Sequence, residues 1–290
     1  MNLLVVIFIQ ASFYALLGMG YVLIYRATRV LNLAHGDLMV FGAYLFFQAL
    51  AASGGSLTLA IIAAVVGAAL LGALVYLGVM RPLASFPVAV GVLATIALGL
   101  VLRTIVTLIW TAQTRYPAEL LGRTGQPIAL FAGVSISGID VLIIAAAIIA
   151  MLGFPLLLRL STVGIEMRGV AENALLAAQR GINLHGVYAL AWSLSTLTGA
   201  LAGILMALDS GVTSGMPVIG LKAFPAALVG GLDSLVGALA GSLIVAAAEV
   251  LLIYYVDPLL ADVVPFLVLI AMLIVRPWGL FGTREELDRV

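Results

Sequence analysis

The chain has 290 residues, of which 64% are hydrophobic and only 9% carry a charge. A soluble globular domain carries about 25% charged residues, so this composition excludes an ordinary soluble domain and indicates a polytopic membrane protein. The formal net charge is zero and cysteine is absent, so the chain has no basic footprint for nucleic acid, no disulfide framework and no metal–thiolate site.

Long, continuous apolar runs predict membrane-spanning helices, because a helix needs about 20 apolar residues to cross a bilayer and barrel strands show alternation instead. We expect an all-α, polytopic transmembrane bundle of about eight to ten spans. The candidate runs are residues 3–25, 36–52, 57–80, 88–112, 139–158, 187–207, 216–232, 236–256 and 259–275. The second and seventh runs are short, and the seventh contains Pro225, which predicts one or two broken or re-entrant helices.

The arginines predict the orientation, because loops rich in Lys and Arg stay in the cytoplasm. Nine spans with the N-terminus outside place most arginines on the cytoplasmic side. We therefore expect residues 1–290 to form a single transmembrane domain with an outer loop at 113–138, a cytoplasmic loop at 159–186 and a cytoplasmic tail at 276–290.

A polar cluster follows the first predicted span, in the stretch "LNLAHGDLMVFGAY" at residues 31–44. Asn32 is a good helix N-cap, Gly36 permits a tight bend, and Asp37 suits the positive end of the next helix dipole. Irregular backbone at membrane depth is tolerated where it lines a cavity. Asn32, His35 and Asp37 are therefore candidates for the translocation path; the alternative is that they only brace the turn.

Three further titratable residues fall inside apolar runs: Arg103, Lys222 and Glu249. Such residues are candidates for a translocation path. For Arg103 we favour snorkelling toward the aromatic belt near Trp110 over contact with substrate. For Glu249 we favour a role in helix packing over contact with substrate.

The string "GALAG" occurs at 199–203 and at 237–241, and each copy is a G-x-x-x-G pattern on an apolar run. Such patterns allow two helix backbones to approach closely. We favour packing within the chain over a contact between subunits.

The loop at 159–186 contains an amphipathic pattern that predicts one short helix over residues 165–180. Gly181 suits the position just after its end, and Arg168 can pair with Glu172. The apolar stripe consists of Met167, Val170, Ala171, Ala174, Leu175 and Ala178. From physics alone, this stripe suits the bilayer surface and a groove on another protein equally well.

Three stretches resemble the integral-membrane permeases of ABC importers for branched-chain amino acids and related amides. They are "LNLAHGDLMVFGAY", the stretch "GVAENALLAAQRGINLHGVYALAWSLSTLTGALAGIL", and "GLKAFPAALVGGLDSLVGALAGSLIVAAAEVLL" together with the closing "RPWGLFG". The resemblance implies that 165–180 is a coupling helix that contacts an ATPase, with Glu172, Ala174, Leu175, Ala178 and Gly181 as the coupling residues.

The resemblance also implies the partners and the location. We expect a second, related permease, two cytoplasmic ATPase subunits and a periplasmic substrate-binding protein around a multi-pass chain in a bacterial inner membrane, with the N-terminus periplasmic. The only lysine, Lys222, has no P-loop context, so ATP hydrolysis is expected in the separate subunits and no cofactor is expected in this chain.

Other functions remain open at this point. An ion-coupled secondary transporter would use Asp37 and Glu249 as intramembrane acids. An intramembrane hydrolase is less favoured, because Ser56 and the two histidines, His35 and His185, are expected near opposite sides of the membrane. An ABC permease for urea or an aromatic acid is a further alternative.

Overall fold

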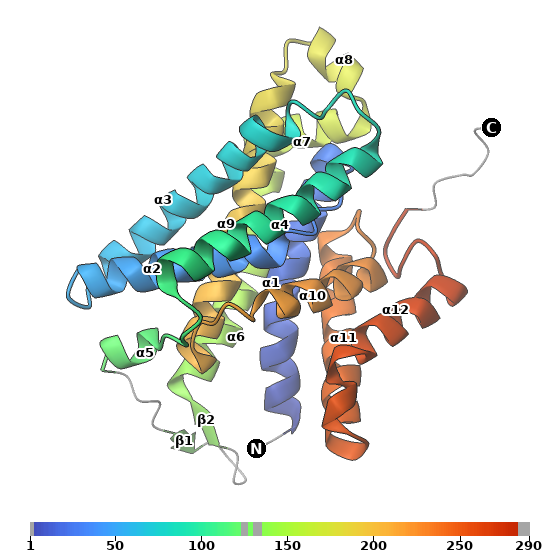
Figure 1. Cartoon of the computed structure of the whole chain (residues 1–290). Coiled ribbons are helices and arrows are strands. Elements are labelled where there is room, and N and C mark those ends of the chain that lie inside the picture. The colour runs from blue at the N-terminus through green and yellow to red at the C-terminus, as the bar shows by residue number, and fades with distance from the viewer. Residues whose placement is uncertain (1–2, 123–126, 130–134, 284–290) are drawn as a thin grey trace.

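The computed structural model describes residues 3–122, 127–129 and 135–283, and nearly all of them are helical (Figure 1). Parts of the predicted outer loop and of the tail, residues 123–126, 130–134 and 284–290, lie outside this description. Within the described residues, six helices are long and apolar enough to cross a membrane. They are α1 (Leu3–Thr28), α3 (Leu57–Val75) with its π-helical extension η1 (Tyr76–Met80), α4 (Val88–Trp110), α6 (Gly138–Leu160), α9 (Leu184–Ser210) and α11 (Leu235–Tyr255). The all-α transmembrane bundle is thus confirmed.

Three of the nine predicted spans are short helices. They are α2 (His35–Ala52), α10 (Pro217–Gly230) and α12 (Val264–Val275). The sequence marked the first two as short, but the predicted span at 259–275 is wrong, because Pro258 and Pro265 confine this region to a 3-10 turn, η3 (Pro258–Asp262), and the 12-residue α12.

The outer-loop region contains a single-turn helix, α5 (Pro117–Leu120), and an antiparallel pair of short strands, β1 (Pro127–Ala129) and β2 (Ser135–Ser137). The pair leads directly into α6. Ser137 and Asp140 form a capping box there, in which each side chain accepts a hydrogen bond from the other residue's backbone.

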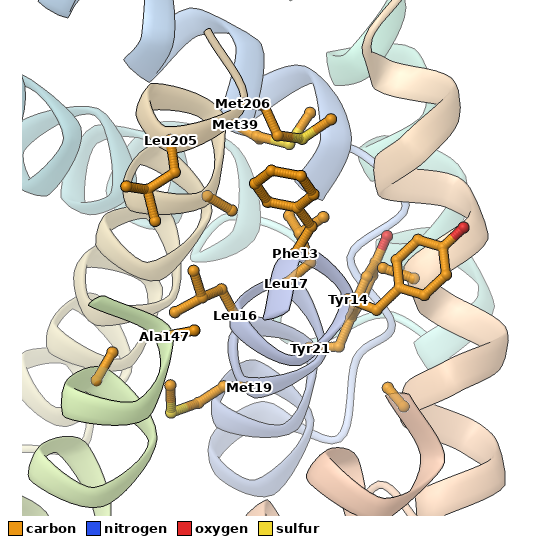
Figure 2. Close-up of a cluster of buried hydrophobic side chains, with 14 of the residues drawn as sticks. Phe13, Tyr14, Leu16, Leu17, Met19, Tyr21, Met39, Ala147, Leu205 and Met206 are labelled. Carbon is orange, nitrogen blue, oxygen red and sulfur yellow. The ribbon is translucent and has the colours of Figure 1, made fainter. Parts of the chain in front are cut away.

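Helix α1 lies at the centre of the bundle, where α6, α9, α10 and α11 pack around it (Figure 1). Its Phe13, Leu16 and Leu17 are buried against Met39 of α2 and Leu205 of α9, as Figure 2 shows. By contrast, α4 exposes large apolar side chains, as expected for a helix that faces lipid.

Small residues set the closest helix contacts. A Cβ atom on Gly203 would lie 2.5 Å from the backbone oxygen of Met39, and one on Gly241 would collide with the backbone of α10. Both GALAG strings therefore pack within the chain, which confirms the prediction.

The expected helix at 165–180 is divided in two, which corrects that prediction. Helix α7 (Thr162–Glu172) ends at Asn173, which has an extended backbone (φ −154°, ψ 98°) and caps the second helix, α8 (Ala174–Gln179), by accepting a hydrogen bond from the backbone NH of Leu176. Asn side chains compete for backbone groups in this way and so favour caps over helix interiors. These two helices lie at one end of the bundle, called here the α7 end, while α5 and the strand pair lie at the other (Figure 1).

Candidate functional site

The turn between α1 and α2 is braced by the buried Asn32. Its Oδ1 accepts a hydrogen bond from the backbone NH of Ala34 at 3.1 Å, and the neighbouring backbone NH of Leu33 donates to Oγ1 of Thr95 on α4. The cap residue of α2 is Ala34, without any side-chain cap, so the prediction that Asn32 is the N-cap is wrong. Asn32 instead closes a local turn two residues before the helix.

Gly36 lies within the first turn of α2 and does not bend the chain. A Cβ atom at this position would lie 2.5 Å from the backbone oxygen of Pro217 and 3.1 Å from Cα of Gly220. Gly36 is therefore required for the close approach of α2 to α10, and the predicted role in a tight bend is wrong.

Asp37 and Arg103 form an ion pair between α2 and α4, with 3.1 Å between Oδ1 and Nε. The Asp37 side chain is 7% exposed and that of Arg103 is 47% exposed. Asp37 occupies the first turn of α2, as predicted from the helix dipole. Arg103 finds its partner in this carboxylate rather than at the aromatic belt, so the snorkelling interpretation is corrected.

His35 is fully buried between α1, α2 and α9. Its ring centroid lies 4.8 Å from that of Tyr21, and its Nδ1 lies 3.4 Å from Oγ of Ser195. A Cβ atom on Gly20 would overlap the imidazole, while one on Gly199 would lie 3.1 Å from it. The glycines thus create the space that the imidazole fills.

A second group of polar side chains lies beside Tyr14 of α1. In this group, Lys222 of α10 forms an ion pair with Glu249 of α11. Their Nζ and Oε1 atoms are 2.9 Å apart, and both residues are buried. The Tyr14 hydroxyl donates to the other carboxylate oxygen, and Asp262 of η3 lies 2.7 Å from the same lysine. The network joins four elements, which agrees with the favoured packing role of Glu249.

The six predicted path residues therefore fall into two groups in the structure. Asn32, His35, Asp37 and Arg103 surround the start of α2, while Lys222 and Glu249 belong to the α10–α11 pair.

Tyr21 lies between His35 and α10. Its ring contacts those of His35 and Phe224, and its hydroxyl donates to the backbone oxygen of Gly220 on α10. Sequence reasoning missed Tyr14 and Tyr21. Their spacing of seven residues on one face of an apolar helix was the available signal.

The predicted coupling residues lie at the α7 end with different exposures. Leu175 is 71% exposed and Ala178 is exposed, whereas Ala174 is half-buried at the start of α8. Glu172 is exposed at the end of α7, and Gly181 has a φ of +85°, which fits its predicted place after the helix end.

The apolar stripe does not form one continuous face. Met167 and Val170 of α7 are buried within the bundle, while Leu175 and Leu176 of α8 point away from it with 71% and 56% exposure. Arg168 donates to the backbone oxygen of Leu158 at 2.9 Å. Of the predicted stripe and its neighbours on α8, Leu175 and Leu176 are therefore the large apolar side chains that the bundle leaves uncovered.

Comparison with known proteins identifies the family. The family model described as the permease component of branched-chain amino acid transport systems matches residues 3–273. The chain is 31% identical to the high-affinity branched-chain amino acid transport permease LivH of Escherichia coli K12, over 96% of this chain and 94% of that protein.

Two further relatives support the same assignment. BraD of Pseudomonas aeruginosa is 30% identical over 96% of this chain and 94% of its own, and a probable LivH of Methanocaldococcus jannaschii is 29% identical over 94% and 90%. No solved structure gives a significant match. Because the family match covers nearly the whole chain, this protein belongs to the family of permease components of branched-chain amino acid transport systems.

Proposed function

We propose that this chain is the membrane-spanning permease subunit of an ATP-driven, binding-protein-dependent ABC importer. It forms part of the translocation path for branched-chain amino acids or related small amides. The observation that carries this proposal is the family match over residues 3–273, together with curated relatives named for branched-chain amino acid transport. The six long apolar helices fit a multi-pass membrane subunit.

The proposed partners are a second related permease, two cytoplasmic ATPase subunits and a periplasmic substrate-binding protein. Support for an ATPase contact comes from α8, where Leu175 and Leu176 are exposed on a short helix outside the bundle. Apolar side chains on a protruding helix suit a groove on another protein. We assign residues 159–186 to this cytoplasmic coupling segment.

The proposed orientation places the α7 end in the cytoplasm. Arg26, Arg29, Arg159 and Arg168 all belong to this end, and the positive-inside rule favours the cytoplasm for such a concentration. The N-terminus would then lie on the outer side. Cysteines introduced at Gln179 and at Gln113 should be modified from opposite sides of the membrane, because the first is on α8 and the second precedes α5. Modification of both from one side would contradict this orientation.

The proposed path runs beside the start of α2. Asp37 and Arg103 carry opposite charges between two helices, and Arg103 is half-exposed. His35 is the first residue of the same helix, and Asn32 lies in the turn that precedes it. Lys222 and Glu249 lie on the neighbouring α10 and α11, and we include them as residues that hold the wall of the path in place.

Reconstitution with the partner subunits tests the proposal. The purified chain should show no ATP hydrolysis, and hydrolysis should require the ATPase subunits and rise severalfold with leucine-loaded binding protein. The ATPase subunits without the permease are the control. Robust turnover by the single chain would contradict the assignment.

A further inference from the structure

A pocket of about 630 Å³ opens at the α7 end, between the last turns of α1 and α6, helix α7 itself and the start of α11. Three arginines, Arg26, Arg159 and Arg168, and one carboxylate, Asp233, line it. Asp233 is engaged by Arg29, with 3.1 Å between the two charged groups. The lining therefore carries an excess of positive charge.

The three arginines that line the pocket do not form ion pairs with carboxylates among the described residues. Among the described residues, neither Arg26 nor Arg159 forms an ion pair, and Arg168 donates a hydrogen bond to the backbone oxygen of Leu158 in the pocket wall. Arg26 and Arg159 each offset the dipole at the end of their own helix. That role needs one arginine at each helix end and does not account for the convergence of three around a cavity.

Two helix N-termini add to the positive field. Gly164 in the first turn of α7 and Leu235 at the start of α11 both line the pocket. The backbone NH of Gly164 already donates to Oγ of Ser161. At the start of α11, the NH of Gly237 donates to Oγ of Ser234. What these two helix ends add is therefore the positive end of each dipole, which favours anions. The pocket therefore combines arginine side chains with the positive ends of two helix dipoles, and both favour an anion.

Apart from Ser234, the remaining lining is apolar, and it meets the membrane-facing side of α6. Leu23, Pro155 and Leu158 line the pocket, and Leu157 and Leu160 beside them on α6 are 57% and 76% exposed. A ligand with a charged head and an apolar body fits such a surface better than a free ion does. Basic pockets between membrane helices at the inner leaflet are suited to lipid head groups.

We propose that this pocket binds the phosphate head group of an anionic phospholipid, with the acyl chains along α6. The site goes beyond the transport function and is separate from the polar residues at the start of α2. The lipid composition of the inner leaflet would then affect the segment that leads into α7.

Binding of phosphatidylglycerol to the purified full chain, measured by native mass spectrometry, tests the proposal. Phosphatidylcholine with the same acyl chains is the neutral probe, and soluble glycerol phosphate is the head group without a tail. Each arginine near an anionic head group is worth about a fivefold change in affinity. The variant Arg26→Gln/Arg159→Gln should therefore weaken phosphatidylglycerol binding by about 25-fold and leave phosphatidylcholine binding unchanged.

The matched control is Arg81→Gln/Arg276→Gln, which removes the same charge from two exposed arginines outside the pocket lining. If the double variant in the pocket loses its helical circular dichroism, the single variant Arg159→Glu serves instead, because Arg159 is exposed and its reversal should reduce binding more than fivefold.

Four results with the purified chain would overturn the proposal. They are unchanged affinity in the pocket variants, an equal loss in the control, equal binding of the two lipids, and full displacement of the lipid by glycerol phosphate, which would indicate a site for a free anion. Loss of the bound lipid when the ATPase subunits assemble would assign the pocket to a protein contact and overturn it as well.

Discussion

Lys222 and Glu249 form an ion pair inside the helix bundle, with 2.9 Å between Nζ and Oε1, and so join α10 to α11. Tyr14 of α1 donates to the second carboxylate oxygen. Both charges are removed from solvent, and each is tolerated there because the other is present. The short helix α10 is thereby held against α1 and α11.

Removal of one partner should be much more harmful than removal of both. We expect Lys222→Met to destabilise the chain by about 3–5 kcal/mol, because it leaves Glu249 with an uncompensated buried charge. The double variant Lys222→Met/Glu249→Leu should recover most of this loss. Thermal unfolding in detergent measures the stability of the single variant and of the double variant. Asp262→Asn is the control, since that carboxylate is 76% exposed and its pairing with the same lysine should contribute at most about 1 kcal/mol.

The glycine positions at the contact between α2 and α10 should not tolerate an added side chain. In Gly220→Ala the new Cβ would overlap the backbone of Gly36, and we expect a loss of about 1–3 kcal/mol on thermal unfolding. Gly153→Ala is the matched control on α6, because nothing lies within 4 Å of a Cβ there. That control should be neutral or stabilising by about 0.5–1 kcal/mol. Equal effects at the two positions would contradict the close approach of the helices.

The ion pair of Asp37 with Arg103 should matter for transport. Asp37→Asn and Arg103→Gln should each lower uptake at least tenfold in an assembled complex while assembly and basal ATP hydrolysis persist, because charged groups at membrane depth mark transport paths. The double variant distinguishes the alternatives. If it restores uptake, the pair is only a structural brace between α2 and α4, and the path assignment is wrong.

The exposed end of α8 should couple hydrolysis to transport. Leu175→Asp places a charge on an exposed apolar position, so the chain should still fold and insert, but hydrolysis stimulated by the loaded binding protein should fall about tenfold. Gln179→Asp adds the same charge to an exposed polar position of the same helix and should change little. Normal stimulation in Leu175→Asp would show that α8 is not the docking face.

Much of the fold could be predicted because apolar run length determines where membrane helices form. The short helices α2 and α10, the first-turn position of Asp37 and the helix end at Gly181 all follow from local signals. The break at Asn173 also had a local signal, since Asn is a preferred N-cap, but the continuous helical periodicity of 165–180 outweighed it.

The pairings inside the bundle could not be predicted. Asp37 and Arg103 are 66 residues apart, and Lys222 and Glu249 are 27 apart. Periodicity indicates which face of a helix is apolar but not which helix lies against it. Helix order and tilt depend on the glycine contacts, such as that of Gly36 with α10, and these emerge only from the three-dimensional packing.

Uptake of labelled leucine into proteoliposomes tests the central claim most directly. The assembled complex of this permease, its partner permease, the ATPase subunits and the loaded binding protein should accumulate leucine only with ATP, and collapse of proton or sodium gradients should have no effect. Gradient-driven uptake by this chain alone, without ATP, would contradict the account and indicate an ion-coupled secondary transporter.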